Sequence, residues 1–145
     1  MRRLLLASAP LVLCMFAQDA PRAKPNPNPA APEVAKTVFE LRTYTCNEGK
    51  LEDLKKRFRD HTIAIFNRHG MESVGYWVPT DGERSKNTLI YILKHPSREV
   101  AAAHWREFSA DPEWKKVNAD SNANGQIVNH VDSVFMEAAD FSAIK

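Results

Sequence analysis

The sequence has 145 residues, of which 43% are hydrophobic and 26% are charged, a composition typical of a single globular domain. The formal net charge is only +2, and two of the basic residues, Arg2 and Arg3, belong to the N-terminal segment described next. The remainder has equal numbers of basic and acidic residues. The composition therefore excludes the basic stripe that nucleic-acid binding requires, and we expect no nucleic-acid partner.

Residues 1–17, MRRLLLASAPLVLCMFA, have the pattern of an export signal. Arg2 and Arg3 precede an apolar run that ends at Ala17 and is shorter than the roughly 20 residues of a membrane-spanning helix. Ala17 suits a signal cleavage site, whereas Met15, two residues earlier, does not. The alternative is an N-terminal anchor, or a misassigned start in front of a cytosolic protein. We expect an exported protein, periplasmic or extracellular, with no stable membrane insertion after cleavage.

Residues 18–36, QDAPRAKPNPNPAAPEVAK, are rich in proline, asparagine and alanine. Proline denies the chain both helical and sheet hydrogen bonds, so this segment is predicted to be a disordered, extended linker. Residues 37–145 then form the single folded domain. The cysteine that remains after signal removal, Cys46, is predicted to be a small buried hydrophobic residue rather than a nucleophile.

The first half of the domain predicts a strand and a long helix. Residues 37–46, TVFELRTYTC, alternate with a period of two and are rich in residues that favour strands. After residues 47–50, one apolar stripe with helical spacing continues to a terminating glycine, which predicts a helix. The stripe consists of Leu51, Leu54, Phe58 and Ile65, and the glycine is Gly70.

The second half predicts a hairpin, two helices and a closing strand. Residues 71–79 and 87–93 are strand-like and flank the turn formers Asp81 and Gly82. Ser97 is expected to cap the next helix, and Asp111 followed by Pro112 to start another that ends before Gly125. The closing strand is HVDSVFMEA, residues 130–138.

This order, βαββαβ, predicts an α+β ferredoxin-like sandwich with a four-stranded antiparallel sheet and helices on one face. Residues 89–93, LIYIL, are apolar on both faces, as in sheets that are covered on both sides. A second copy of the chain is the simplest cover, which gives a homodimeric α/β barrel. In this arrangement Phe39 and Leu41 would face the helices, while Glu40, Arg42 and Tyr44 would face the space between the two sheets.

Four segments together resemble the NIPSNAP family, whose domain belongs to the dimeric α/β-barrel group. They are FELRTYTCNEGKLEDL, HGMESVGYWVPTDG, NTLIYILKHPSREVAAAHWREFSADPEW and VDSVFMEAADFS. The resemblance as a whole covers nearly all of the chain from Val38 to Ser142. The resemblance implies the dimeric barrel but no defined activity and no catalytic residue set. Eukaryotic members are associated with mitochondria, and the export signal and proline-rich linker depart from that pattern.

Arg42 and Tyr44 are the first candidates for a ligand site, since arginine offers a planar set of donors for an anion and tyrosine adds a hydroxyl. The alternative is that Glu40 or a carboxylate of the partner subunit neutralises Arg42 at an interface. Three large aromatic residues, Trp77, Tyr91 and Trp105, are further candidates for lining a pocket for a flat apolar ligand, although most aromatic residues belong to the core.

His61 and His104 lie at the flanks of the two apolar helix stripes and are the candidate catalytic bases. A histidine hydrogen-bonded at the core boundary is the alternative for each. The sequence has no histidine pair or cysteine cluster with metal-ligand spacing, no glycine-rich phosphate loop and no Gly-x-Ser-x-Gly motif, so neither a metal nor a cofactor is expected.

Three functions remain open. The first is an exported homodimeric module that binds a small apolar or aromatic molecule, which can be anionic, between its two sheets. The second is a cofactor-free enzyme of the dimeric α/β-barrel type, oxygenase-like or isomerase-like, with a histidine base and Arg42 as anion stabiliser. The third is a purely structural or protein-interaction module.

Overall fold

The computed structural model describes residues 36–145. The expected export signal, and all of the expected linker except Lys36, lie outside the described residues. Within the described part, no helix combines the length and the apolar character that a membrane crossing requires. The elements are β1 (Val38–Cys46), α1 (Leu51–Arg57), a π-helical turn η1 (Phe58–Thr62), α2 (Ile63–Arg68), β2 (Glu72–Trp77), α3 (Arg84–Asn87), β3 (Thr88–His95), α4 (Arg98–Ala110), α5 (Pro112–Ser121) and β4 (Val128–Met136).

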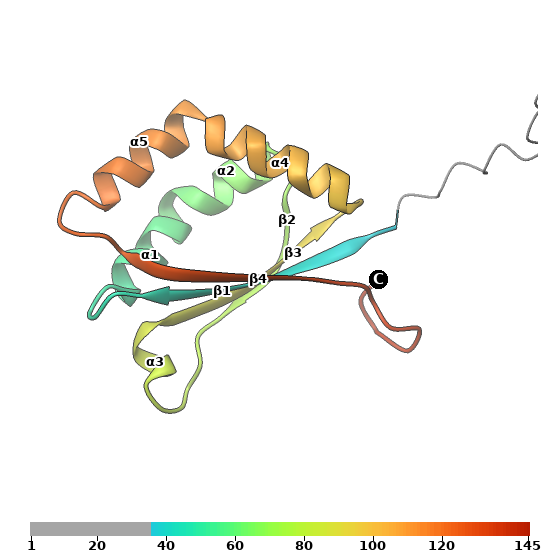
Figure 1. Ribbon diagram of the computed structural model, residues 1–145, viewed down its shortest axis with the longest axis horizontal. Helices are drawn as coiled ribbons and strands as arrows, with labels where there is room; N and C mark the ends of the chain where they lie inside the picture. The colour runs from blue at the N-terminus through green and yellow to red at the C-terminus, as the bar shows by residue number, and fades with distance from the viewer. Residues whose placement is uncertain (1–35) are drawn as a thin grey trace, which may run out of the picture. The chain divides into compact units, whose positions relative to one another are not determined.

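The four strands form one antiparallel sheet in the order β2-β3-β1-β4. The helices α1, α2, α4 and α5 lie together on one face of this sheet, while the short α3 belongs to the connection between β2 and β3 (Figure 1). The α+β ferredoxin-like βαββαβ fold and its hairpin are therefore confirmed.

The helix ends follow the chemistry that the sequence predicts. Ser97 accepts a hydrogen bond from the backbone N–H of Val100 at the start of α4. The Asp111 carboxylate accepts from two backbone N–H groups in the first turn of α5, where Pro112 is the first residue. After α2, Gly70 adopts a positive φ of 70°, which a residue with a side chain rarely adopts.

The long first helix differs from a regular α-helix because it contains the π-helical turn η1. Thr62, four residues after Phe58, is buried on the side of the apolar stripe, and His61 is exposed. The Thr62 hydroxyl donates to the backbone carbonyl of Arg57 at 3.2 Å. The four residues of the predicted apolar stripe, Leu51, Leu54, Phe58 and Ile65, are all buried, so the stripe is confirmed although the π-helical turn was not predicted.

The orientation predicted for β1 is wrong. Glu40, Arg42 and Tyr44 face the helices of their own chain: Trp105 of α4 donates to Glu40, and Tyr44 packs against Phe58 of η1. The reason is that Glu40 is buried together with hydrogen-bond donors, so its charge is satisfied inside the protomer and is compatible with a core position.

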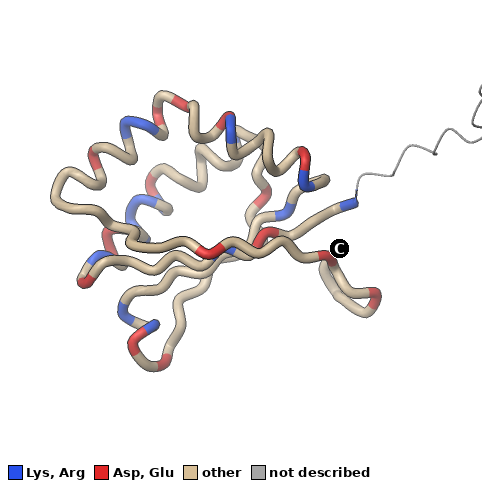
Figure 2. Tube along the Cα trace, viewed as in Figure 1, with Lys and Arg blue, Asp and Glu red and all other residues tan. Residues whose placement is uncertain are grey.

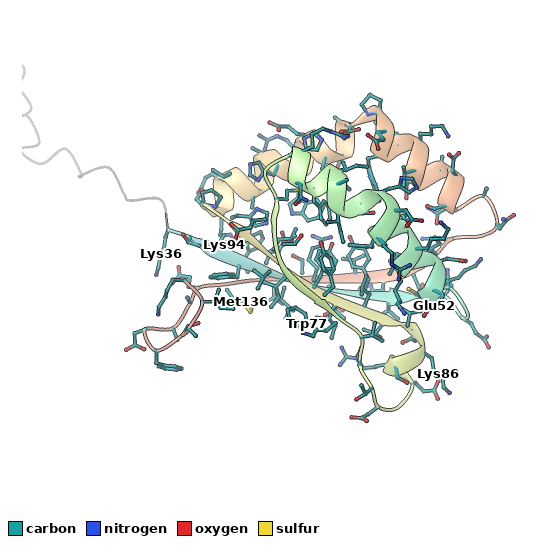
Figure 3. The ribbon with its side chains drawn as sticks, turned by 180° about the vertical axis from the view of Figure 1, so that it is seen from behind. Lys36, Glu52, Trp77, Lys86, Lys94 and Met136 are labelled. Carbon is teal, nitrogen blue, oxygen red and sulfur yellow. The ribbon has the colours of Figure 1, made fainter. Side chains whose placement is uncertain are left out.

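Phe39 and Leu41 accordingly face the side of the sheet that carries no helices. There, Phe39 lies among Ile92, Met136 and the segment after β4. Trp77 and Met136 are seen on this side in Figure 3, and the Trp77 ring lies directly over Gly75. We call this surface the open face.

The open face remains partly apolar. On β3, Leu89, Tyr91 and Leu93 are buried under the helices, whereas Ile90 and Ile92 on the open face are only partly buried. Elsewhere on the open face Trp77 is 49% exposed and Val134 is 53% exposed. The expectation that both faces of β3 are apolar is confirmed.

Charged residues are distributed without segregation of sign. Figure 2 shows basic and acidic positions interspersed along the helices and loops. Several of them form ion pairs one helical turn apart, such as Lys55 with Glu52 and Lys116 with Asp120. These exposed pairs contribute little to stability individually.

Candidate functional site

A pocket of about 500 Å³ lies on the helix side of the sheet, and we call it the inner pocket. Its aromatic wall consists of Tyr44, Phe58, Phe66, Phe108 and Trp114, and its other lining residues are Arg57, Thr62, Asn118, Asn122, Gln126, Val128 and Val131. The volume is in the range of small-molecule sites, and the lining combines an aromatic wall with a polar side formed by Arg57, Thr62, Asn118, Asn122 and Gln126.

The aromatic wall is assembled from several elements. Phe58 on η1 makes edge contacts with Tyr44 of β1 and with Phe66 of α2. Phe66 also contacts Phe108 of α4, which in turn lies against Trp114 of α5, with ring centroids 4.4 Å apart. The wall therefore depends on the sheet and on helices from both halves of the domain, with Phe58 contributed by the π-helical turn.

Arg57 is the cation of this pocket. It is only 6% exposed, and its guanidinium lies 5.3 Å from the centre of the Trp114 ring. Its Nη1 lies 3.4 Å from Asn118 Oδ1 and 3.3 Å from Ser121 Oγ, while its Nε has no hydrogen-bond partner. Within the described residues, no carboxylate forms an ion pair with Arg57.

A second polar cluster surrounds Glu40, which is 1% exposed. Its carboxylate accepts from Arg42 Nη1 at 2.7 Å, from Trp105 Nε1 at 2.7 Å and from the Ser133 hydroxyl at 2.6 Å, and His95 Nε2 lies 3.3 Å away. Burial alone would raise the pKa of Glu40, but its partners, first among them His95 and Ser133, outweigh burial and hold the pKa at about 2.

Arg42 is the charge partner of this cluster. It lies over the Trp105 ring, with its guanidinium carbon 4.2 Å from the ring centre, and it pairs with Glu40. The alternative that Glu40 neutralises Arg42 therefore holds, within one protomer rather than at an interface. Arg42 has no free charge to offer to a ligand, unlike Arg57.

Residues 39–143 match the family model described as NIPSNAP. The chain belongs to the NIPSNAP family. It is similar to a NIPSNAP-family protein of unknown function from Agrobacterium tumefaciens, with 24% identity and a TM-score of 0.66 over 77% of this chain and 96% of that one. An uncharacterized NIPSNAP domain protein from Burkholderia xenovorans gives 24% identity and a TM-score of 0.62 over 72% and 97% of the two chains.

Two further comparisons limit what can be said of activity. SnoaB, described as a cofactor-independent oxygenase from Streptomyces nogalater, is 14% identical, with a TM-score of 0.50 over 77% of this chain and all of that one. This likeness shows the fold alone. No curated protein matches this NIPSNAP chain significantly.

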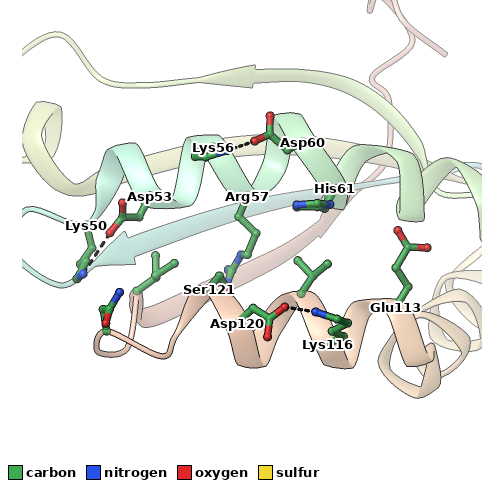
Figure 4. A pocket seen from close by; sticks show the side chains of 13 residues that line it. Lys50, Asp53, Lys56, Arg57, Asp60, His61, Glu113, Lys116, Asp120 and Ser121 are labelled. Carbon is green, nitrogen blue, oxygen red and sulfur yellow. Dashed lines mark hydrogen bonds and ion pairs between the residues drawn. The ribbon is translucent and has the colours of Figure 1, made fainter.

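The two histidines proposed as bases do not line the inner pocket of the NIPSNAP domain. His61 is exposed and lies in a surface groove of about 540 Å³ between α1 and α5, which we call the outer groove (Figure 4). His104 lies beside Gly70 and His95, and burial, with the nearby His95, lowers its pKa. The structure therefore brings neither histidine to the pocket.

The aromatic candidates of the NIPSNAP domain also separate. Tyr44 lines the inner pocket, whereas Tyr91 is fully buried behind it and stacks on Tyr76. The Tyr91 hydroxyl is buried without a hydrogen-bond partner, and burial, with Tyr44 nearby, raises its pKa well above the usual value. Trp105 belongs to the Glu40 cluster, and Trp77 to the open face.

Arg57 is the site residue that sequence reasoning missed. A signal was present, because Arg57 follows Leu54 by three residues and so lies at the edge of the apolar stripe. A charged residue at such a position is rarely buried unless it is paired. By contrast, Cys46 is buried as predicted, and burial raises the pKa of its thiol to about 11.

Proposed function

We propose that this NIPSNAP-family protein binds a small aromatic molecule in the inner pocket. The observation that carries the proposal is the aromatic wall around a volume of about 500 Å³. The sequence predicted a binding site between the two sheets of a dimer. The site proposed here lies between the sheet and the helices of a single chain, because the polar face of β1 points toward the helices.

The inner pocket favours binding over catalysis with a histidine base. Among the described residues that line it, none is histidine, cysteine, aspartate, glutamate or lysine, and the ionisable ones are Tyr44 and Arg57. General acid–base catalysis needs a group that exchanges protons near neutral pH. SnoaB is described as an oxygenase, but no residue of the inner pocket supports the same activity for the present chain.

Replacing Val131 by tryptophan is expected to block the inner pocket. The neutral probe N-phenyl-1-naphthylamine, whose fluorescence rises in apolar surroundings, is expected to bind the unchanged protein and to bind Val131→Trp at least about tenfold more weakly. The matched control is Val134→Trp, on the same strand but on the open face. No binding to the unchanged protein would favour a purely structural role, and weakening by Val134→Trp alone would place the probe on the open face.

We also propose that two protomers associate through their open faces. Trp77 and Val134 are exposed there beside Leu41, Ile90 and Ile92, and such a surface on a symmetric pair is self-complementary. A second copy is the occupant that would bury the apolar open face of β3 just as the helices bury its other face.

Sedimentation equilibrium tests this association. The unchanged protein is expected to be a dimer, and Val134→Glu is expected to be monomeric because it would place two carboxylates in an apolar interface. Ala102→Glu, on the exposed side of α4, is the control and should leave the dimer intact. A monomeric unchanged protein would rule the association out.

A further inference from the structure

Arg57 stands between the inner pocket and the outer groove, because it lines both. Figure 4 shows its side chain extending from α1 toward Ser121 on α5, across the floor of the outer groove. Its guanidinium is therefore placed where a molecule in the inner pocket and solvent in the outer groove meet.

The acidic residues of the outer groove do not neutralise Arg57, since each has its own basic partner. Asp53 pairs with Lys50, and Glu113 pairs with Arg68. The remaining two acidic residues, Asp60 and Asp120, pair with Lys56 and Lys116 respectively. Arg57 is therefore the buried cation of the outer groove, and the four acidic residues of this groove are paired with other basic residues.

The neutral partners of Arg57 use little of its hydrogen-bonding capacity. A guanidinium has five N–H donors, yet its two contacts, to Asn118 and Ser121, are long and come from the same nitrogen, Nη1. A buried charge with no counterion is unfavourable for folding, so an arginine kept at such a position points to an anion that is bound from outside the chain. Burial lowers the pKa of Arg57, but guanidinium remains protonated at neutral pH.

We infer that the ligand of the inner pocket is an aromatic acid whose anionic group is held by Arg57. This inference rests on the proposed function. A carboxylate fits the planar donor set of arginine in a bidentate manner, and the rings of the ligand would lie against Phe58 and Trp114. We therefore assign anion binding to Arg57 rather than to Arg42, because Arg42 is already paired with Glu40.

Two probes that differ in one acidic group test this assignment. N-phenyl-1-naphthylamine is neutral, and 8-anilino-1-naphthalenesulfonate carries the same ring system with a sulfonate. The protein is expected to bind the sulfonate at least about tenfold more tightly than the neutral probe. Arg57→Met, which keeps the buried chain length but not the charge, is expected to abolish this preference while retaining the neutral probe.

The controls separate this inference from the proposed function. Arg59→Met removes an exposed arginine two residues away and should leave the preference unchanged. Arg57→Gln is the second variant if Arg57→Met does not fold. Equal affinity for both probes, or a preference that survives loss of Arg57, overturns the anionic ligand class while the pocket proposal stands. Failure of both probes to bind at a site sensitive to Val131→Trp overturns the pocket proposal itself.

Discussion

Glu40→Ala is expected to destabilise the NIPSNAP domain by about 3–5 kcal/mol, the range for breaking a buried ion pair by removing one partner. The truncation would leave Arg42 without its counterion and the Trp105 indole N–H without its acceptor, both in the interior. Urea unfolding followed by far-ultraviolet circular dichroism measures the change. Glu72→Ala, an exposed glutamate on β2, is the matched control and should change stability by less than about 0.5 kcal/mol.

A double variant separates the lost charge pair from the lost packing. If the cost of Glu40→Ala arises from the unpaired guanidinium, Glu40→Ala combined with Arg42→Met should be more stable than Glu40→Ala alone, because no buried charge is left unmatched. Additive losses from the two substitutions would show instead that each side chain stabilises the core independently. A loss for Glu40→Ala no larger than that of Glu72→Ala would contradict the burial of this cluster.

The Glu40 cluster shows which feature of the fold could not be predicted from the sequence, namely which face of β1 is buried. The period-two pattern of residues 37–46 correctly predicts a strand, and the order of elements predicts the sheet. Which face of β1 turns toward the helices depends on the hydrogen-bond partners of Glu40. Two of these partners, Trp105 and Ser133, lie 65 and 93 residues further along the chain. An alternating pattern predicts that the apolar residues of a strand face the core. In β1 the polar face is the inner one, because its buried glutamate has all its hydrogen bonds satisfied.

The sequence predicted which residue types form the site, but not which individual residues come together in it. Arginine, tyrosine and tryptophan were expected to form a pocket, and Tyr44 does line one. The arginine that lines the inner pocket, however, is Arg57, for which the described residues provide no carboxylate partner, and pairing is a property of three-dimensional neighbours rather than of spacing. The π-helical turn η1 was not predicted either, because the apolar stripe keeps the spacing of a regular helix through it.

Acid is expected to weaken the domain through the same carboxylate. The pKa of Glu40 is about 2 in the folded protein against an ordinary value of 4.5, so its ionisation contributes stability that is fully present above about pH 4.5 and is lost as the pH falls toward 2. The whole shift corresponds to about 3 kcal/mol, of which about 2 kcal/mol should be lost between about pH 6 and about pH 3.

Glu40→Gln isolates this contribution, because glutamine keeps the size of the side chain and does not titrate. Other carboxylates with lowered pKa values, such as Asp111, are present in both proteins and cancel in the comparison. The stability advantage of the unchanged protein over Glu40→Gln should therefore shrink by about 2 kcal/mol between about pH 6 and about pH 3 in urea unfolding. An advantage that stays constant over this interval would mean that Glu40 titrates alike in the folded and unfolded chains, and that its ring of donors does not hold the ionised form.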